Sequence, residues 1–241
     1  MTIVTTFHDF EGNYGMPDAT PKCLAALVRI AEIEKRHRIR STYNTVALLA
    51  REQPQIVRAL VADGHEIASH SYDHSVLADL SPADQLTNIR DSADIFGELG
   101  IRITGHRSPL SRWNRALMQN LCAEGFTWTA ENGGEPHPYI VSRRGRAKLW
   151  RFPVRADDWA YESANMAPPQ MLAYWQAIVN EARRSKRYTA IGFHPWIEYN
   201  EGRLETLECF MAWLDSLPDV EVLPFGAVLA LLDQQAASTL S

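Results

Sequence analysis

Three features follow one another in the stretch Gly64-His65-Glu66-Ile67-Ala68-Ser69-His70-Ser71-Tyr72-Asp73-His74: the end of a helix, a β-strand and a pair of histidines. The glycine ends a segment in which apolar residues recur at helical spacing. Residues 65–69 predict a strand, and the histidines come directly after it. The same order recurs along the chain, in which a short β-branched or aromatic run is followed by polar residues and then by a longer helical segment.

This alternation of short strands and longer helical segments predicts the fold class. Helix-length connections between successive strands require those strands to be parallel. Seven or eight such units in 241 residues favour a closed or nearly closed α/β barrel, and an open doubly wound sheet is the alternative. Gly12 and Gly15 match the nucleotide fingerprint of that alternative poorly. We expect one domain over residues 1–241, a long loop over 132–148, and strands at 2–7, 39–44, 65–69, 101–105, 126–129, 149–154, 189–193 and 220–223.

Composition argues against several classes of protein. With 24 Lys and Arg against 29 Asp and Glu, the formal net charge is -5, so no basic excess is available to bind nucleic-acid phosphates. The mean hydropathy is -0.25, and no apolar run approaches the length of a membrane span. The first residues predict a strand rather than a signal peptide, and Cys23, Cys122 and Cys209 are isolated on apolar helical faces. We therefore expect a cytoplasmic protein whose cysteines are reduced core residues.

Polar side chains follow almost every predicted strand. In a parallel barrel the carboxyl ends of the strands meet at one rim, where chemistry gathers. Each of these residues alone has an ordinary explanation, because loops are polar. Together they predict an active site at that rim, formed from His8, Asp9, Glu11, Asn44, His70, His74, His106, Arg107, Glu131, Asp157, Asp158 and His194.

The histidine pair suggests a metal site. His70 and His74 are four residues apart, so on a helical turn they would face the same way and could share one metal; capping or surface histidines are the alternative. Asp9, at the end of the first strand, would add a carboxylate. Two histidines, one carboxylate and open positions suit zinc, which supplies hydroxide near neutral pH and polarises a carbonyl.

Three further residues have expected roles beside that metal. His194 follows a buried strand that stops at a proline, and a metal hydrolase needs a group that protonates the leaving amine; a histidine at the barrel rim is the alternative. Arg107 and Asp158 could pair across the mouth and tune a catalytic base, or form an ordinary ion pair.

Five motifs show a family resemblance. They are Thr6-Phe7-His8-Asp9-Phe10 where the family has Thr-Phe-Asp-Asp-Gly, His70-Ser71-Tyr72-Asp73-His74 for His-Ser/Thr-x-x-His, Arg107-Ser108-Pro109-Leu110 for Arg-x-Pro-Tyr/Phe, then Asp158-Trp159 and His194. On these motifs the chain resembles the polysaccharide deacetylases, the NodB-homology proteins or carbohydrate esterase family 4, over residues 3 to about 232. The His194-Pro195 form is similar to the cytoplasmic branch that holds peptidoglycan-deacetylase-like and allantoinase-like proteins.

The resemblance implies a fold and a reaction. The fold would be a distorted (β/α)7 barrel of the TIM-like kind. Asp9, His70 and His74 would bind a divalent metal, zinc first and cobalt or nickel otherwise, and His194 would be the acid. Arg107 and Asp158 would orient the base or the acid. The reaction would be hydrolysis of an N-linked acyl group, with the oxyanion held by the metal and a backbone N–H near Leu110.

Two departures from the family motifs leave alternatives open. His8 stands where the family has its base, so either His8 is the base, or Asp9 is the base with Glu11 as metal ligand, or catalysis is lost and the barrel only binds metal or carbohydrate. Leu110 replaces an aromatic residue and makes that wall more apolar.

The expected partner is a small-molecule or carbohydrate amide, with no nucleic acid and no membrane span. Trp113, Trp159 and Trp196 follow predicted strands and could stack on a sugar or heterocycle, or simply pack. An N-acetylated sugar is the first choice of substrate, and a cyclic amide or ureide is the alternative. A homo-oligomer is left open.

Overall fold

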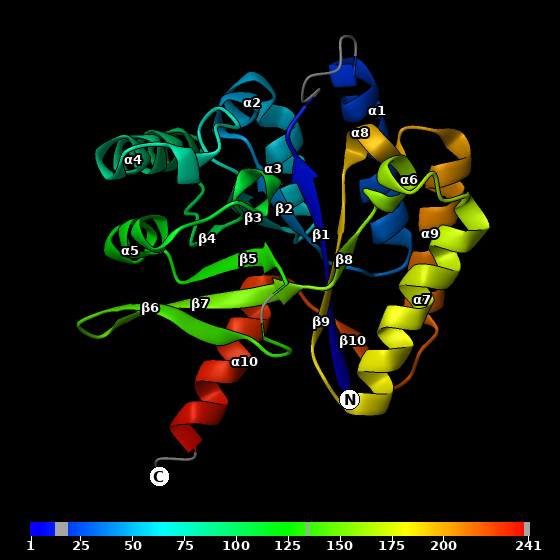
Figure 1. Cartoon of the computed structure of the whole chain (residues 1–241). Helices are drawn as coiled ribbons and strands as arrows, with labels where there is room; N and C mark the ends of the chain where they lie inside the picture. Colours follow the sequence, from blue (N-terminus) through cyan, green and yellow to red (C-terminus); the bar gives the residue numbers. More distant parts are fainter. Residues whose placement is uncertain (13–18, 134, 239–241) are drawn as a thin grey trace.

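A single sheet organises the computed structural model, which describes residues 1–12, 19–133 and 135–238 (Figure 1). The strand order is β6-β7-β5-β4-β3-β2-β1-β9-β8, and β10 pairs with β1. The strands are β1 (Thr2–Phe10), β2 (Thr42–Thr45), β3 (Glu66–Ser69), β4 (Gly105–His106), β5 (Trp128–Asn132), β6 (Tyr139–Arg144), β7 (Ala147–Val154), β8 (Ala156–Asp157), β9 (Thr189–Phe193) and β10 (Val220–Val222).

The mainly parallel sheet agrees with the distorted barrel that the family resemblance implies, although the described strand ladders do not close its ring. Within the described chain, every strand pairing is parallel except that of β6 with β7. β7 pairs with β5, and one residue later the chain continues as β8, which pairs with β9. At the residue between them, the Arg155 N–H donates to the Ala190 carbonyl at 3.1 Å. The chain itself therefore crosses the last gap of the ring, where the described residues form no ladder between β7 and β9.

Helices surround this sheet, and their ends follow local sequence rules. Pro54, Pro82 and Pro168 stand in the first turn of their helices, and the Ser81 hydroxyl caps α4 by accepting from the Asp84 N–H. The helices are α1 (Ala19–Arg36), α2 (Ala47–Glu52), α3 (Pro54–Ala62), η1 (Leu77–Asp79), α4 (Pro82–Glu98), η2 (Pro109–Ser111), α5 (Arg115–Ala123), α6 (Ala160–Ser163), α7 (Pro168–Ser185), α8 (Pro195–Glu198), α9 (Glu201–Asp215) and α10 (Phe225–Ser238). Across the described ranges, no helix combines the length and apolarity that a membrane crossing needs.

Aromatic rings form a large part of the barrel interior. Phe7 of β1, Trp128 of β5 and Phe225 of α10 belong to one buried cluster, with the Trp128 and Phe225 ring centroids 4.7 Å apart. Two glycines make room for them, since a Cβ at Gly105 would lie 1.9 Å from the Trp128 ring and one at Gly192 would lie 2.4 Å from the Phe7 ring. This packing supports the rim from below.

Two expectations are wrong. Residues 132–148 are not a loop, because they contain β6, which pairs antiparallel with β7 through a turn at Gly145 with φ +59°. The run Tyr139-Ile140-Val141 has the aromatic and β-branched residues typical of strands. Cys23 and Cys122 are buried as expected, but Cys209 is exposed on α9; all three are free thiols.

Candidate metal centre and active site

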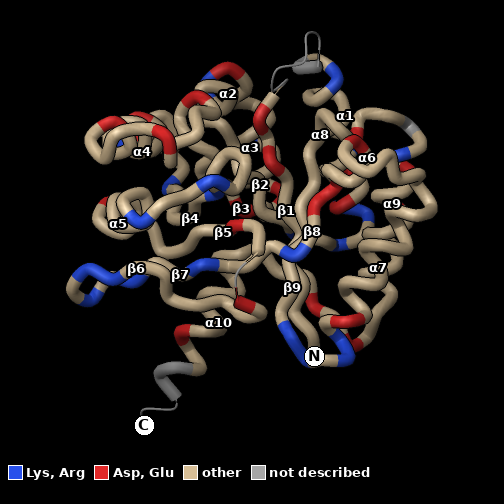
Figure 2. Tube along the Cα trace, viewed as in Figure 1, with Lys and Arg blue, Asp and Glu red and all other residues tan. Residues whose placement is uncertain are grey.

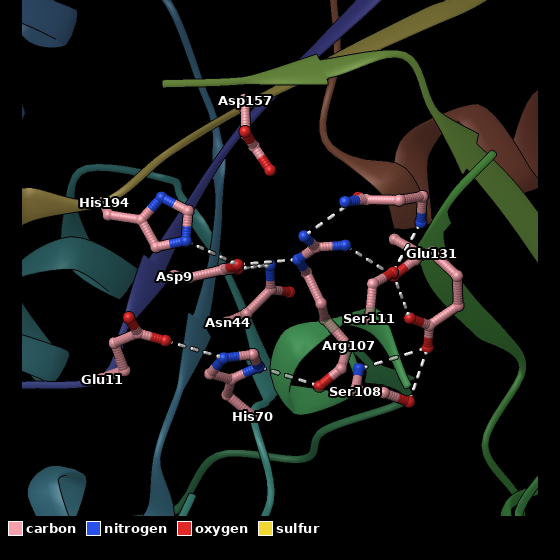
Figure 3. A network of polar contacts seen from close by, with 12 residues as sticks. Asp9, Glu11, Asn44, His70, Arg107, Ser108, Ser111, Glu131, Asp157 and His194 are labelled. Atoms are coloured by element: carbon pink, nitrogen blue, oxygen red, sulfur yellow. Dashed lines mark hydrogen bonds and ion pairs between the residues drawn. The ribbon is translucent and has the colours of Figure 1, made fainter. Parts of the chain in front are cut away.

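A cavity of about 250 Å³ opens at the carboxyl ends of the strands. Strand register brings its walls together, because Asp9 lies beside Asn44, Ser69 beside His106, and His8 beside Phe193. Figure 3 shows side chains from several strand ends pointing toward this space. The cavity is lined by Asp9, Glu11, His70, Arg107, Leu110, Asn132, Asp157, Trp159, His194 and Trp196.

A cluster of three ligand-type side chains adjoins this cavity, and two of them, Glu11 and His70, line it. The ligand atoms of Glu11, His70 and His74 all lie within 4.8 Å of one another. The Nε2 atoms of His70 and His74 lie 3.1 and 2.8 Å from the same oxygen, Glu11 Oε2. Two imidazoles and one carboxylate form a donor set suited to a zinc-class divalent cation with open positions.

The tautomer of His70 fits a metal ligand. Its Nδ1 lies 2.8 Å from the Arg107 carbonyl oxygen, which can only accept, so Nδ1 carries the proton. Nε2 is then the nitrogen that faces Glu11: it donates to Glu11 Oε2 when the ring is protonated and offers its lone pair to a cation when the ring is neutral. A ring nitrogen fixed in this way by a backbone carbonyl is typical of histidines that bind metals.

The His70–His74 segment is an irregular bend and not the helical turn that the spacing suggests. Ser71 and His74 both have positive φ, at +69° and +67°. The bend is held from outside: the Ala47 and Leu48 N–H groups of α2 donate to the carbonyls of Ser71 and Tyr72. Such backbone strain persists only where the surroundings determine it, and it is common at functional sites.

Electrostatics in the cluster favour a bound cation. Burial alone would raise the pKa of Glu11, but hydrogen bonds from His70 and His74 outweigh it and hold that pKa well below its usual value. Burial would lower the pKa of His70, yet Asp9 and Glu11 outweigh it and raise that pKa. The Glu11 carboxylate is therefore ionised, and its negative charge favours a cation beside the two histidines.

Asp9 lies next to the cluster but outside it. Its Oδ1 accepts from Asn44 Nδ2 at 2.8 Å, and its Oδ2 accepts from Arg107 Nε at 2.7 Å. Burial would raise the pKa of Asp9, but Arg107, His70 and His194 outweigh it and lower that pKa. The geometry of the structure therefore matches the second of the expected arrangements, in which Glu11 joins the two histidines and Asp9 lies beside them.

His194 faces Asp9 from the opposite side. Its Nδ1 donates to Asp158 Oδ1 at 2.6 Å, and its Nε2 lies 3.5 Å from Asp9 Oδ2. Burial opposes protonation of this ring, but Asp158 above all, with Glu11 and Asp9, raises the pKa of His194 to about 10. Asp158 therefore pairs with His194, and Arg107 pairs with Asp9, rather than with one another as expected.

His8 does not reach the cavity. Its ring is fully buried on the outer face of β1, with Nε2 2.7 Å from Glu34 of α1. Successive residues of a strand point to opposite faces, so Asp9 and Glu11 share the rim while His8 faces the helices. The expectation that His8 could serve as base is therefore corrected by its position.

One functional feature was not predicted from the sequence, namely the way in which Glu131 organises the turn at η2. Its Oε1 accepts from the Ser108 N–H and from the Ser108 hydroxyl, and its Oε2 accepts from the Ser111 hydroxyl (Figure 3). Between these serines, Leu110 has φ +56° and is 56% exposed at the cavity. Glu131 was recognised only as a polar strand end, since its partners are about twenty residues away in the sequence.

The three tryptophans that follow predicted strands lie in two different places. Trp159 and Trp196 line the cavity, with ring centroids 5.6 Å apart. Trp113 lies elsewhere, with the Arg151 guanidinium 4.6 Å from its ring centroid. Only two of the three expected stacking residues therefore reach the cavity.

Sequence comparison places the chain among known proteins. A family model described as polysaccharide deacetylase matches residues 2–128. A chitooligosaccharide deacetylase from Bradyrhizobium sp. (strain ANU 289) is 24% identical over 176 residues. That match covers 71% of this chain and 65% of the relative, so the chain spans less than two thirds of the relative's length.

Solved structures show the same fold. A Mycobacterium smegmatis protein, provisionally assigned as a polysaccharide deacetylase, superposes with a TM-score of 0.87 at 21% identity, covering 98% of this chain and 91% of that one. Puue allantoinase gives 0.81 at 19% identity, covering 94% and 88%. A family 4 acetyl xylan esterase from Clostridium thermocellum, in complex with a cobalt ion, gives 0.67 at 19% identity, covering 95% and 91%.

Proposed function

Since the chain belongs to the polysaccharide deacetylase family, we propose that it is a metal-dependent hydrolase of carbon–nitrogen bonds other than peptide bonds. Its reaction would remove the acetyl group from an N-acetylated sugar or a related small amide. The observation that carries this proposal is the Glu11, His70 and His74 cluster at the edge of the cavity that Asp9 and His194 also line.

The cluster would hold the metal, with zinc as first choice and cobalt or nickel as alternatives. Glu11, His70 and His74 offer one carboxylate oxygen and two imidazole nitrogens. Bound there, the cation would acidify a water molecule and polarise the carbonyl of the substrate. The cobalt ion in the acetyl xylan esterase of the same fold supports a divalent cation in this family.

Asp9 would be the base that takes the proton of the attacking water. Its low pKa keeps it ionised, and Arg107 and Asn44 hold both oxygens in place at 2.7 and 2.8 Å. Removing one partner of this buried group would leave the carboxylate misplaced, so Arg107 acts by positioning it.

His194 would be the acid that protonates the leaving nitrogen. An amine leaves a tetrahedral intermediate only after protonation, and a ring with a pKa near 10 carries that proton at neutral pH. Asp158 holds the Nδ1 side at 2.6 Å, so Nε2 is the atom directed to the substrate. A backbone N–H near Leu110, a residue that lines the cavity, would hold the oxyanion.

The shape of the cavity supports a small substrate. Pockets for small molecules begin at about 300 Å³, so a cavity of about 250 Å³ accommodates one ring rather than a length of polymer. Trp159 and Leu110 offer apolar walls on which one sugar face could rest. The deacetylase name of the Bradyrhizobium relative favours an amino sugar, and the allantoinase fold neighbour keeps a cyclic amide or ureide as second candidate. We place this activity in the cytoplasm, because the three cysteines are free thiols.

Metal binding and turnover test the proposal together. Protein stripped with a chelator and given zinc, cobalt or nickel should hydrolyse members of a panel of N-acetyl sugars and ring amides. His70→Ala and His74→Ala should each lose most of the metal and the activity, since two ligands hold a divalent cation poorly. His137→Ala is the matched control, because His137 is exposed and lies outside the cluster.

Two outcomes would contradict it. Wild-type protein that binds none of the three metals would exclude the metal centre. Protein that binds metal but hydrolyses no member of the panel would support the rival interpretation, a barrel that binds metal or carbohydrate without catalysis.

A further inference from the structure

The indole of Trp196 donates a hydrogen bond to the carboxylate of the metal-type cluster. The Trp196 Nε1 atom lies 2.6 Å from Glu11 Oε1, whereas both histidines contact the other oxygen, Oε2. We propose that Trp196 is a positioning residue that fixes Glu11 as a one-oxygen metal ligand. This inference rests on the proposed function, because it requires a cation at the cluster.

The two oxygens of Glu11 have different partners, Trp196 for one and the two histidines for the other. A hydrogen bond from a neutral N–H to a carboxylate is short and strong, and the indole N–H can only donate. With Oε1 engaged by Trp196, Oε2 is the oxygen that faces His70 and His74. Glu11 would then offer a cation one oxygen beside the two histidine nitrogens, which leaves room for water and substrate.

The strand register explains why Trp196 meets Glu11 although 185 residues separate them in the sequence. β1 and β9 are parallel neighbours in which His8 lies beside Phe193. Glu11 and Trp196 each come three residues after that pair, so they leave the sheet at the same level. The contact therefore follows from the pairing of the two strands.

Trp196 is held firmly enough to orient its partner. It is 5% exposed and lies in α8, whose Ile197 and Glu198 N–H groups both donate to the His194 carbonyl. Its ring contacts Trp159, with centroids 5.6 Å apart, and His194, with centroids 6.0 Å apart. The same short segment thus carries both the acid and the residue that orients a metal ligand.

Metal affinity gives the first test, and it needs no substrate. Trp196→Phe keeps an aromatic ring but removes the N–H, so the zinc dissociation constant should rise by roughly 10- to 100-fold, the effect typical of losing an outer partner of a ligand. Trp175→Phe is the matched control. Trp175 is fully buried, and its Nε1 has no hydrogen-bond partner within the described ranges, so zinc affinity should stay at the wild-type value.

An indole signal gives the second test and uses wild-type protein. In a sample with ¹⁵N-labelled tryptophan, the resonance that Trp196→Phe removes should be shifted downfield and protected from hydrogen exchange, both before and after zinc is added. Loss of that protection on zinc binding would show Glu11 turning both oxygens to the metal and would overturn the inference.

The outcomes separate this inference from the proposed function. Wild-type protein that binds none of zinc, cobalt and nickel would refute both. Wild-type protein that binds zinc, with Trp196→Phe binding equally well, would refute the role of Trp196 and leave the metal centre standing.

Discussion

Neighbouring residues of β1 have different roles because a strand alternates its side chains between two faces. Asp9 and Glu11 point to the rim, where they contact Arg107 and the histidine pair. His8, the residue directly before Asp9, points outward to Glu34. A residue two positions from Asp9 can share its site, while the residue next to it cannot.

This alternation predicts how three substitutions differ. Asp9→Asn should keep the metal but lower kcat by roughly 100-fold or more, since a general base contributes that much. Glu11→Gln should lose metal and activity together. His8→Asn should keep the metal and the kcat of the folded protein, because the ring lies outside the cavity. Metal content and steady-state kinetics on the same preparations measure all three.

The opposite pattern would restore His8 as the base. In that case His8→Asn would be folded, fully loaded with metal and inactive, and Asp9→Asn would retain most of its turnover.

The residues of the site could be predicted from the sequence, but their partners could not. Strand ends alone identified Asp9, His70, Arg107 and His194 as rim residues. The sequence could also have decided between His8 as base and Asp9 as base with Glu11 as ligand. Side chains alternate between the two faces of a strand, so Asp9 and Glu11 share one face and His8 lies on the other. The bond from Trp196 to Glu11 could not be predicted, because it depends on the register of strands that are distant in sequence.

At the scale of elements, the turn at η2 depends on one buried carboxylate. Leu110 and Ser111 have φ values of +56° and +53°, which side-chain-bearing residues rarely adopt. Glu131 accepts from the serine hydroxyls on either side, and the Ser111 hydroxyl in turn accepts from the Asn132 N–H at 2.6 Å. These bonds hold the backbone in a conformation that it would otherwise leave.

Glu131→Gln should loosen this turn without removing a ligand or a proton donor. An amide nitrogen cannot accept the hydrogen bonds that the lost oxygen accepted, so the backbone N–H groups near Leu110 should drift from the oxyanion position. We expect kcat to fall by about 10- to 100-fold, with KM and metal content nearly unchanged. Steady-state kinetics and metal analysis test this.

Glu124→Gln is the control, since Glu124 pairs with Arg90 at the surface of the neighbouring helix end. A fall in metal content, or an equal effect in the control variant, would argue against a role for Glu131 in the turn.

Helices were easier to predict than the strands and turns around them. Prolines and caps mark helix starts locally, as at Ser81 and Pro82. β4 has only two residues, Gly105–His106, so its place in the sheet depends on its neighbours rather than on its own sequence. The hairpin of β6 was hidden because its pattern of Gly and basic residues also fits a loop.

At the scale of the whole molecule, a buried charge network joins the sheet to α1. Glu34 is fully buried and contacts His8, Ser41 and Tyr43. Burial would raise the pKa of Glu34, but His8 first, then His65 and the Ser41 hydroxyl, outweigh it and lower that pKa. The ionised form is therefore favoured in the folded protein.

This shift predicts a loss of stability in acid. A carboxyl group with a lowered folded pKa stabilises the fold above its unfolded pKa of about 4.3, and this contribution is lost as the pH falls through the folded pKa. Glu34→Gln should therefore cost about 3 kcal/mol of unfolding free energy at pH 7, and less as the pH approaches 3. Urea unfolding between pH 7 and pH 3 measures the difference.

Glu208→Gln gives the comparison, because its pair with Arg36 is exposed and should contribute under about 1 kcal/mol. A Glu34→Gln deficit that stayed constant down to pH 3 would mean that packing, and not the charge of Glu34, stabilises this region.

The alternation of strands and helices predicts the barrel-like parallel sheet, but it does not predict how the chain links β7 to β8 across the remaining gap. The chain passes from β7 to β8 through Arg155 alone, changing its partner strand from β5 to β9. No local pattern marks such a change, because it depends on where β5 and β9 lie when the sheet is complete.

The hairpin of β6 and β7 also bears on how the protein avoids aggregation. β6 ends the sheet order, so one row of its backbone groups has no strand beside it among the residues described, and an open edge of this kind is a template for amyloid-like growth. Its apolar run Tyr139-Ile140-Val141 is followed by Arg143 and Arg144, both exposed. Figure 2 shows positive charge gathered at this tip of a chain whose net charge is -5. Copies stacked in register would align these arginines at every step, and the repulsion between them would oppose fibril extension.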